Sequence, residues 1–259
     1  MRTVNATRYV TPLREGGSLP AIIEADDDGM YVLKFRGAGQ GVRALTAELL
    51  GGEIARMLKL PVPELVFVNL DPVLSRSEPD YEIRSLVKNS GGLNLALDYL
   101  PGAFGFDAAR TQDVSPELAS MIVWLDAFIA NVDRTARNTN LILWHRRLHL
   151  IDHGAALYYQ HDWMKYPEQA RNPFPQIKDH VLLDIASGIE AADRAARDLL
   201  QGDAIEKIVK LVPDDWFTSN PETADPAGAR AVHQRFLEER LAASAVFVTE
   251  AVNGRHTHV

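Results

Sequence analysis

The sequence contains no cysteine, which excludes a disulfide framework and any metal site built on thiolates. It also lacks an apolar run approaching the roughly 18–20 residues that a membrane-spanning helix needs. No block of Lys and Arg stands out, so the chain carries no electrostatic footprint for nucleic acid. Residues 1–10 have neither the charged head nor the apolar stretch of a signal peptide. We therefore expect a cytoplasmic protein whose partners include neither membrane nor nucleic acid.

What is present is ordinary globular composition. The chain has 259 residues, of which 46% are hydrophobic and 24% charged, and its formal net charge is -8. This length can bury a sizeable core and suits one large domain or two lobes of about 100–150 residues each. Composition alone excludes classes of protein but does not assign a function.

The first third of the chain reads mainly as strands. A helix is predicted at residues 45–58, where apolar side chains repeat at helical spacing. The acidic turn at residues 26–29 predicts a hairpin between its flanking runs. The β-prone runs are residues 9–13, 21–24, 30–35, 65–70 and 81–87, and residues 93–99 follow a break in the chain at residues 89–92.

Beyond residue 98 the pattern becomes mostly helical, and we predict a boundary between two lobes there, 1–98 and 99–259. Ser115 followed by Pro116 resembles a helix start, with Ser as the cap and Pro at the first helical position. Two further strands are predicted at residues 140–144 and 148–151. Helices are predicted at residues 116–130, 179–186, 189–200, 204–211 and 229–251. Strands first and helices later indicate the α+β class.

The most informative stretch is residues 131–154. It places Asn138 five positions after Asp133, then a hairpin, and then an apolar run that ends at Asp152. Phosphoryl transfer needs a carboxylate to orient the attacking hydroxyl and oxygen ligands to hold Mg²⁺ on the phosphates. Each residue alone is commonplace, but the combination predicts one base and two metal ligands around one cleft.

The segments 133–138 and 150–154 resemble the catalytic loop and metal-binding motif of HipA-like kinases and of phosphatidylinositol 3- and 4-kinases. This resemblance implies a bilobal protein-kinase-like fold with ATP and Mg²⁺ between a β-rich N-lobe and a helical C-lobe. It also implies that Asp133 is the catalytic Asp, with Asn138 and Asp152 as Mg²⁺ ligands. These two lobes would form one catalytic unit.

Lys34 lies inside a β-prone run, where kinase-like lobes carry the Lys that holds the α- and β-phosphates. That Lys needs a carboxylate from the next helix, and Glu48 and Glu53 compete for this role. The two lie about 140° apart on a helix of 3.6 residues per turn, so only one can face Lys34. Similarity to the Glu-bearing helix of HipA-like kinases favours Glu48.

Two glycine-containing segments are candidates for phosphate contact. Gly16, Gly17 and Ser18 form a tip between two strands, where backbone N–H groups can approach phosphates. The richer cluster at residues 37–41 follows the Lys strand and lacks the GxGxxG spacing. We interpret it as a flexible connector.

The resemblance also assigns the segment that joins the lobes, where the backbone of Asp98, Tyr99 and Leu100 would meet the adenine edge. The sequence departs from the family pattern at two positions. Thr135 stands where these families usually have His, and His153 stands where they usually have Phe. The acidic and amide ligands are preserved at both motifs.

The resulting hypothesis is transfer of the ATP γ-phosphate to a hydroxyl, in the first place that of a protein Ser or Thr. A small-molecule or lipid acceptor is an alternative, as is a nucleotide-binding module without catalysis. The resemblance leaves room for a regulatory protein partner. A zinc site at His145, His149 and His153 is disfavoured, because these residues fall on a predicted hairpin and no HExxH occurs. The sequence has no GxSxG turn, which disfavours Ser/His/Asp hydrolase chemistry.

Overall fold

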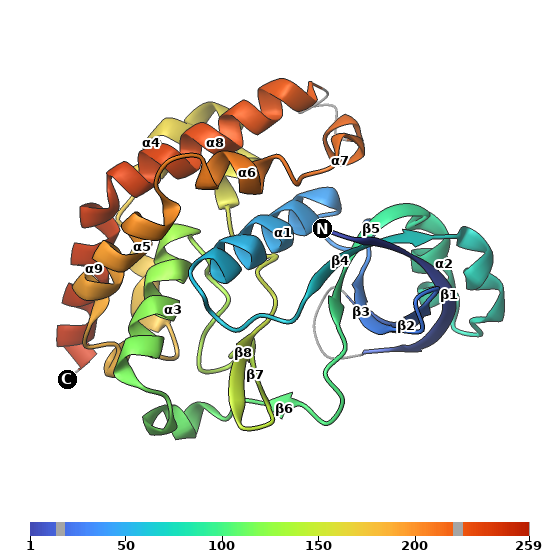
Figure 1. The fold of residues 1–259 in the computed structure, drawn as a ribbon, viewed down its shortest axis with the longest axis horizontal. Helices are drawn as coiled ribbons and strands as arrows, with labels where there is room; N and C mark the ends of the chain where they lie inside the picture. The colour runs from blue at the N-terminus through green and yellow to red at the C-terminus, as the bar shows by residue number, and fades with distance from the viewer. Residues whose placement is uncertain (14–18, 220–224, 259) are drawn as a thin grey trace.

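The computed structural model describes residues 1–13, 19–219 and 225–258. One end of the molecule is a closed barrel in which the strands follow the order β1-β2-β3-β5-β4 (Figure 1). Neighbouring strands pair antiparallel, except that β1 closes the barrel by pairing parallel to β4. The barrel strands are β1 (Thr3–Pro12), β2 (Ala21–Ala25), β3 (Met30–Lys34), β4 (Leu65–Leu70) and β5 (Gly92–Asp98).

Alternation along β3 determines where its charged residue points. Successive side chains of a strand face opposite sides of a sheet. Tyr31 and Leu33 are buried in the hydrophobic cluster that fills the barrel. Lys34, the next residue, therefore lies on the outer wall of the barrel, where it meets α1 and the helical part.

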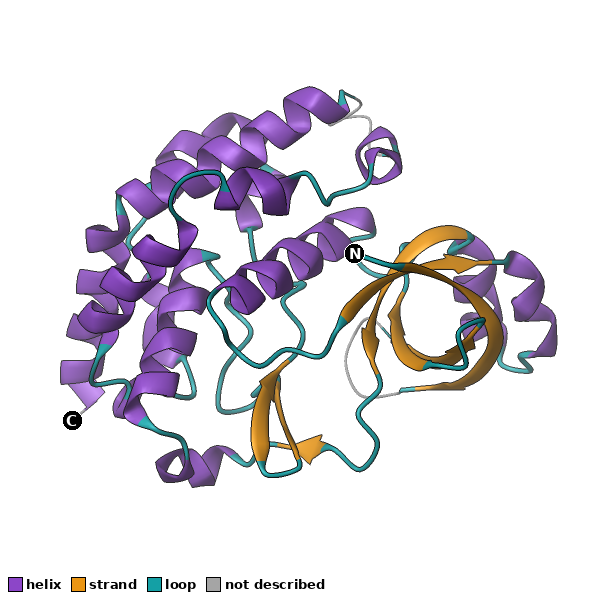
Figure 2. Cartoon of the chain, viewed as in Figure 1, coloured by secondary structure: helices purple, strands orange, loops and turns teal. Residues whose placement is uncertain are grey.

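The remainder of the molecule is mainly helical, and α1 (Val42–Met57) runs between the barrel and the other helices (Figure 2). A small sheet contains β6 (Phe104–Gly105), β7 (Leu141–Trp144) and β8 (Arg147–Leu150). The other α-helices are α2 (Tyr81–Asn89), α3 (Pro116–Phe128), α4 (Tyr166–Ala170), α5 (Ile189–Leu200), α6 (Ala204–Val209), α7 (Asp214–Thr218), α8 (Pro226–Ala242) and α9 (Ser244–His258). The 3₁₀-helices are η1 (Pro72–Ser77), η2 (Ala108–Asp113), η3 (Tyr158–His161), η4 (Trp163–Lys165), η5 (Pro175–Asp179) and η6 (Leu183–Ile185).

Two adjacent glycines let α1 approach both parts of the molecule closely. A Cβ added to Gly51 would lie 2.7 Å from Cβ of His153, in the loop after β8. A Cβ added to Gly52 would lie 2.6 Å from Cδ1 of Leu65, on the barrel strand β4. Two glycines inside a helix lower its intrinsic stability. The close packing on both sides of α1 explains why glycine occupies both positions.

One predicted strand is wrong. Residues 81–87 form the helix α2, which begins at Asp80, whose carboxylate accepts N–H groups of the first turn. Ile83 and Val87, four positions apart, are its buried residues and pack with the barrel core. An acidic cap followed by apolar residues at helical spacing predicts a helix, but the β-prone residues of this segment favoured a strand.

The predicted helix at residues 179–186 is also wrong, since this segment holds only the last residue of η5 and the three-residue 3₁₀-helix η6. Its polar groups bond elsewhere: the N–H of Val181 donates to the Arg134 carbonyl, and His180 contacts a buried carboxylate on α3. The helix predicted at 229–251 is instead two helices, α8 and α9, which meet at Ala243. The helix at α3 begins as predicted, with the Ser115 hydroxyl accepting from Leu118 N–H at 3.2 Å.

The α+β class is thus confirmed. The lobe boundary after residue 98 stays a prediction, because α1 precedes it and yet shares its hydrophobic core with the helices that follow it. Among the described helices, none combines the length and the apolar character needed to cross a membrane.

Candidate active site

Lys34 lies at the centre of a partly buried ion cluster. Its Nζ is 2.8 Å from Oδ1 of Asp152 and 3.7 Å from Oε2 of Glu48. Burial opposes the charge of Lys34, but the two carboxylates outweigh it and raise the pKa of Lys34 above its ordinary value. Lys34 therefore stays protonated as a fixed cation.

Glu48, rather than Glu53, faces this Lys. Its side chain is 2% exposed, and its Oε2 accepts the backbone N–H of His153 at 2.8 Å. Burial would raise the pKa of Glu48, but the charge of Lys34 and the bond from His153 lower it to about 2. Glu53 pairs instead with Arg56 on the same helix, at 2.8 Å.

Asp133 is held by amide groups. Its Oδ2 accepts Nδ2 of Asn138 at 2.8 Å and Nδ2 of Asn140 at 3.1 Å. Its own N–H donates to Oδ1 of Asn131 at 3.1 Å. Neutral donors orient the carboxylate without neutralising its charge.

A buried network positions this loop. Asp126, on α3, accepts Nε of Arg134 at 2.5 Å and Nε2 of His180 at 2.9 Å on one oxygen, and Nδ2 of Asn131 at 2.9 Å on the other. Burial would raise the pKa of Asp126, but Arg134 and His180 outweigh it and hold that pKa well below its usual range. Both Asp126 and Arg134 have fully buried side chains.

The same Arg134 joins the two groups of site residues. Its guanidinium donates to the carbonyl of Asn140, which holds Asp133, and to the carbonyl of Ile151 at 3.3 Å, directly before Asp152. Ile151 N–H also donates to the Asn140 carbonyl at 3.1 Å. Asp133 with Asn138, and Asp152 with Lys34 and Glu48, are thus fixed to one frame.

Sequence reasoning missed this supporting network. Asp126 and His180 were assigned no role, although an Asp inside the apolar helix at residues 116–130 is a readable signal, because buried carboxylates need partners. Asn140, two residues after the predicted ligand Asn138, was assigned only to a strand. The buried partner of each becomes visible only when residues far apart in the chain are brought together.

The predicted adenine segment leaves the barrel after β5. The N–H of Asp98 donates to the Glu64 carbonyl at 2.8 Å, and the N–H of Tyr99 to the Met30 carbonyl at 3.0 Å. Burial, with Glu64 nearby, raises the pKa of Asp98. Leu100 is buried, and within the described part of the chain its N–H has no acceptor.

Three other predictions concern residues 16–18, the glycines at residues 37–41 and a zinc site. Gly16, Gly17 and Ser18 lie outside the described residues. The residues 37–41 form turns leading into α1, whose start at Gly41 has a φ of 65°. No three His, Asp or Glu side chains among the described residues are placed together to hold a metal ion.

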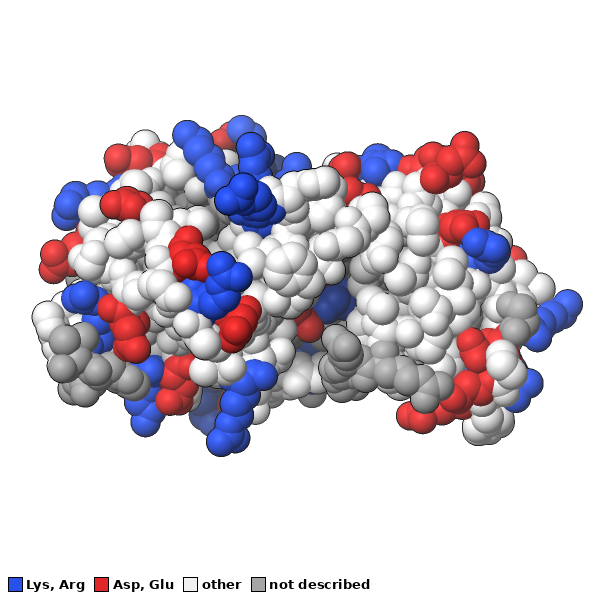
Figure 3. Space-filling model, turned by 90° about the horizontal axis from the view of Figure 1, so that it is seen from below, with Lys and Arg blue, Asp and Glu red and all other residues white. Residues whose placement is uncertain are grey.

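The donor set fits a magnesium–phosphate group. Lys34 supplies one positive charge, whereas Glu48, Asp133 and Asp152 supply three negative ones, an excess that a divalent cation would offset. Carboxylate and amide oxygens are the ligands Mg²⁺ prefers. The Asp152 side chain is 38% exposed, so its oxygens are accessible. Figure 3 shows charged atoms of both signs recessed in the notch between the two parts of the molecule.

The model of the HipA-like kinase family matches residues 7–244. The chain belongs to this family. Among solved structures it is similar to the Helicobacter pylori proinflammatory kinase CtkA, with a TM-score of 0.55 and 12% identity over 97% of this chain and 98% of that one. It is also similar to the Golgi casein kinase, with a TM-score of 0.52 and 13% identity over 99% of this chain and 75% of that one. No curated protein matches the sequence.

At these identities the solved structures show the fold alone, and they confirm the bilobal kinase-like arrangement. Membership of the HipA-like family confirms the resemblance carried by residues 133–138 and 150–154. Family and fold together make the chain a kinase-type phosphotransferase.

Proposed function

We propose that this HipA-like kinase transfers the γ-phosphate of ATP to the hydroxyl of a polypeptide Ser or Thr, with Mg²⁺ as the metal. The observation that carries the proposal is the convergence of Lys34, Glu48 and Asp152, tied through Arg134 to an oriented Asp133. The similar Golgi casein kinase was solved with Mn/ADP bound, which supports a nucleotide and a divalent metal here.

Each side chain then has a role that its surroundings favour. Lys34, held protonated by two carboxylates, binds phosphate oxygens. Asp152 and Asn138 would hold the metal, which when bound offsets negative charge on the phosphates. The N–H of Leu100 is available to the adenine edge, because the N–H groups of Asp98 and Tyr99 are bonded within the protein.

Asp133 takes the proton of the acceptor. Its Oδ2 receives two amide donors, whereas no described residue donates to its Oδ1. This oxygen can accept the acceptor O–H and orient its oxygen toward phosphorus. The new bond joins that oxygen to the γ-phosphorus, the bond to the departing ADP oxygen breaks, and the proton passes to Asp133.

The test compares variants of two site carboxylates with a variant of a carboxylate far from the site. Asp133→Asn should slow transfer about 10²–10⁴-fold and still bind Mg·ATP, because this residue acts on the acceptor. Asp152→Asn should lose both transfer and binding. Asp198→Asn, at an exposed position on α5, is the matched control and should change neither.

Radiolabelled transfer and calorimetric Mg·ATP titration measure the two properties separately. Loss of nucleotide binding in Asp133→Asn, together with full activity in Asp152→Asn, would reverse the assigned roles. Absence of any Mg·ATP binding by the unmodified protein would overturn the proposed function itself.

A further inference from the structure

A cavity of about 240 Å³ is lined by none of the residues of the ion cluster described above. Val132, the residue directly before Asp133, forms part of its wall. Val132 is 45% exposed and Tyr158, on η3, is 62% exposed, so both lie at the open side. Tyr159 and Arg240 lie at the buried end. We name this cavity the Val132 pocket; the lining residues used below are Val132, Tyr158, Tyr159, Asn172, Gln176 and Arg240.

The walls of the Val132 pocket are almost entirely neutral. None of the described residues that line it is Asp, Glu, Lys or His. Aromatic and aliphatic groups dominate, with side-chain amides such as Asn172 and Gln176 at the exposed rim. A charged occupant would lose its water without gaining a counter-ion, which is costly.

The one charge in the lining, that of Arg240, is already committed. Its guanidinium donates to the carbonyls of Ala127 and Phe128 at the end of α3. It also donates to the carbonyls of Gln169 and Ala170 at the end of α4 and of Asn172 just after it. Burial lowers the pKa of Arg240 to about 10. Arg240 therefore joins two helix ends to each other, and its donors point to the protein rather than to a ligand.

The size of the cavity favours a large side chain. An apolar protein cavity of about 150 Å³ binds benzene, so the Val132 pocket has room for an aromatic ring or a branched aliphatic group. Consecutive residues of an extended peptide advance about 3.3 Å. A side chain one or two positions from the acceptor hydroxyl can thus reach the pocket while that hydroxyl meets Asp133.

We infer that the Val132 pocket receives a large neutral side chain, aromatic or aliphatic, one or two residues from the acceptor hydroxyl of a polypeptide. This inference rests on the proposed function, in which Asp133 orients that hydroxyl. In this inference Val132 and Tyr158 at the open side, together with the amides at the rim, determine which peptide sequences are phosphorylated.

The experiment uses the full chain with Mg·ATP and a library of Ser-containing peptides, randomised at the two positions on each side of the Ser. At one of these positions Phe, Tyr, Trp, Leu or Met should be preferred over Asp, Glu, Lys and Arg by roughly tenfold or more. A flat profile at all four positions, or a preference for a charged residue, overturns the inference.

A charge introduced at the rim tests whether this pocket determines which residue is preferred near the acceptor Ser. Gln176→Glu keeps the side chain's shape at an exposed position, and should shift the preferred residue at that position toward Lys and Arg by about tenfold. Asn172→Asp is a second variant with the same expectation. Gln201→Glu, after α5 and outside the lining, is the matched control and should keep the original profile.

Failure of the inference is distinguishable from failure of the proposed function. If Gln176→Glu and Asn172→Asp both leave the profile unchanged while Asp133→Asn still abolishes transfer, the pocket assignment is wrong and the phosphotransfer mechanism stands. Transfer to a small molecule but to no peptide would likewise contradict the pocket assignment and leave the phosphotransfer chemistry in place. If no transfer depends on Asp133, both proposals fail together.

Discussion

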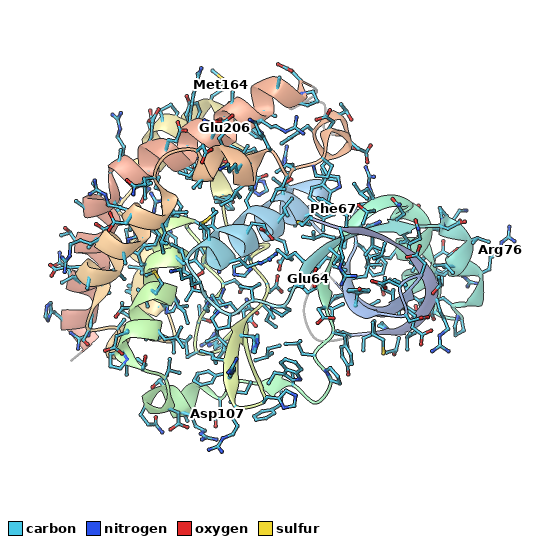
Figure 4. All side chains as sticks on the ribbon, viewed as in Figure 1. Glu64, Phe67, Arg76, Asp107, Met164 and Glu206 are labelled. Carbon is cyan, nitrogen blue, oxygen red and sulfur yellow. The ribbon has the colours of Figure 1, made fainter. Side chains whose placement is uncertain are left out.

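The interior of the barrel is filled by its own strands and by α2, whereas the core of the helical part also takes in α1 and the outer wall of the barrel. Leu65 and Phe67 of β4 belong to this second core, and Figure 4 labels Phe67 where the barrel meets α1. In chain order α1 belongs with the barrel strands. In packing it belongs with the helices that follow.

This difference determines which contacts cross between the two parts. Lys34 comes from the barrel wall, whereas Glu48 and Asp152 are fixed on the helical side, so their ion cluster is itself a contact between parts. A second contact comes from α7, where Nε1 of Trp216 donates to the Leu93 carbonyl at 3.0 Å and the ring packs edge-on against Phe67. Relative motion of the parts would therefore separate Lys34 from Glu48 directly.

Two charge pairs, one from each part, differ in burial. The barrel pair Arg8–Glu24 is at the surface, with side chains 64% and 36% exposed. The helical pair Arg134–Asp126 is fully buried. Exposed pairs contribute little to stability, whereas breaking a buried pair leaves an uncompensated charge.

The largest expected effect follows from this contrast. Asp126→Asn should lower the free energy of unfolding by about 3–5 kcal/mol, because Arg134 stays buried without its carboxylate. Glu24→Gln on the barrel should lower it by about 0–1 kcal/mol. Urea unfolding at neutral pH measures both. Equal losses in the two variants would contradict the contrast between the buried and the exposed pair.

The sequence predicted those parts of the candidate site that follow chain order. Lys34, Asp133 and Asp152 could be assigned because strand, loop and metal motif succeed one another in a recognisable sequence. The choice of Glu48 over Glu53 from residues alone stayed open, since it depends on the rotation of α1, which packing on both sides determines.

Other features could not be predicted because their causes are non-local. The Asp126–Arg134–His180 network joins residues up to 54 positions apart, and a single sequence does not reveal such pairs. The same limit applies to residues 179–186, where bonds to Arg134 and Asp126 replace a helix. The error at α2 is different in kind, because its Asp80 cap and its Ile83–Val87 spacing were readable.

An intermediate effect concerns acid stability. The pKa of Glu48 is lowered to about 2 in the folded protein, so its stabilisation is fully present above its ordinary pKa of 4.5 and is lost as pH falls toward 2. Its full size is about 3 kcal/mol. Glu48→Gln should therefore flatten the loss of stability between about pH 4.5 and 2, leaving the contribution of Asp126.

Glu53→Gln, on the same helix, is the matched control and should keep the original slope. All four Trp residues lie after residue 98, so fluorescence reports on the helical part in these unfolding curves. Identical slopes in the two Glu variants would show that Glu48 is not selectively stabilised in its ionised form.

The smallest expected effect compares the two faces of α1. Gly51→Ala places a methyl group 2.7 Å from Cβ of His153, which is fully buried and cannot move away freely. Gly52→Ala meets only the side chain of Leu65, which is also buried, and the one close atom is Cδ1 at its far end. Both changes gain the same helix propensity, about 1 kcal/mol, so the difference between them isolates the contact.

We expect Gly51→Ala to be less stable than Gly52→Ala by about 1–3 kcal/mol, the usual cost of overpacking. It should also transfer phosphate more slowly, because displaced His153 carries the N–H that holds Glu48 and follows Asp152 directly. Urea unfolding and radiolabelled transfer, with Gly52→Ala as the control, measure the two effects. If Gly52→Ala lost as much stability and activity as Gly51→Ala, α1 would be fixed no more tightly to the helical part than to the barrel. Lys34 on the barrel and Glu48 on α1 would then belong to one rigid unit, and the ion cluster would not be a contact between two separate parts.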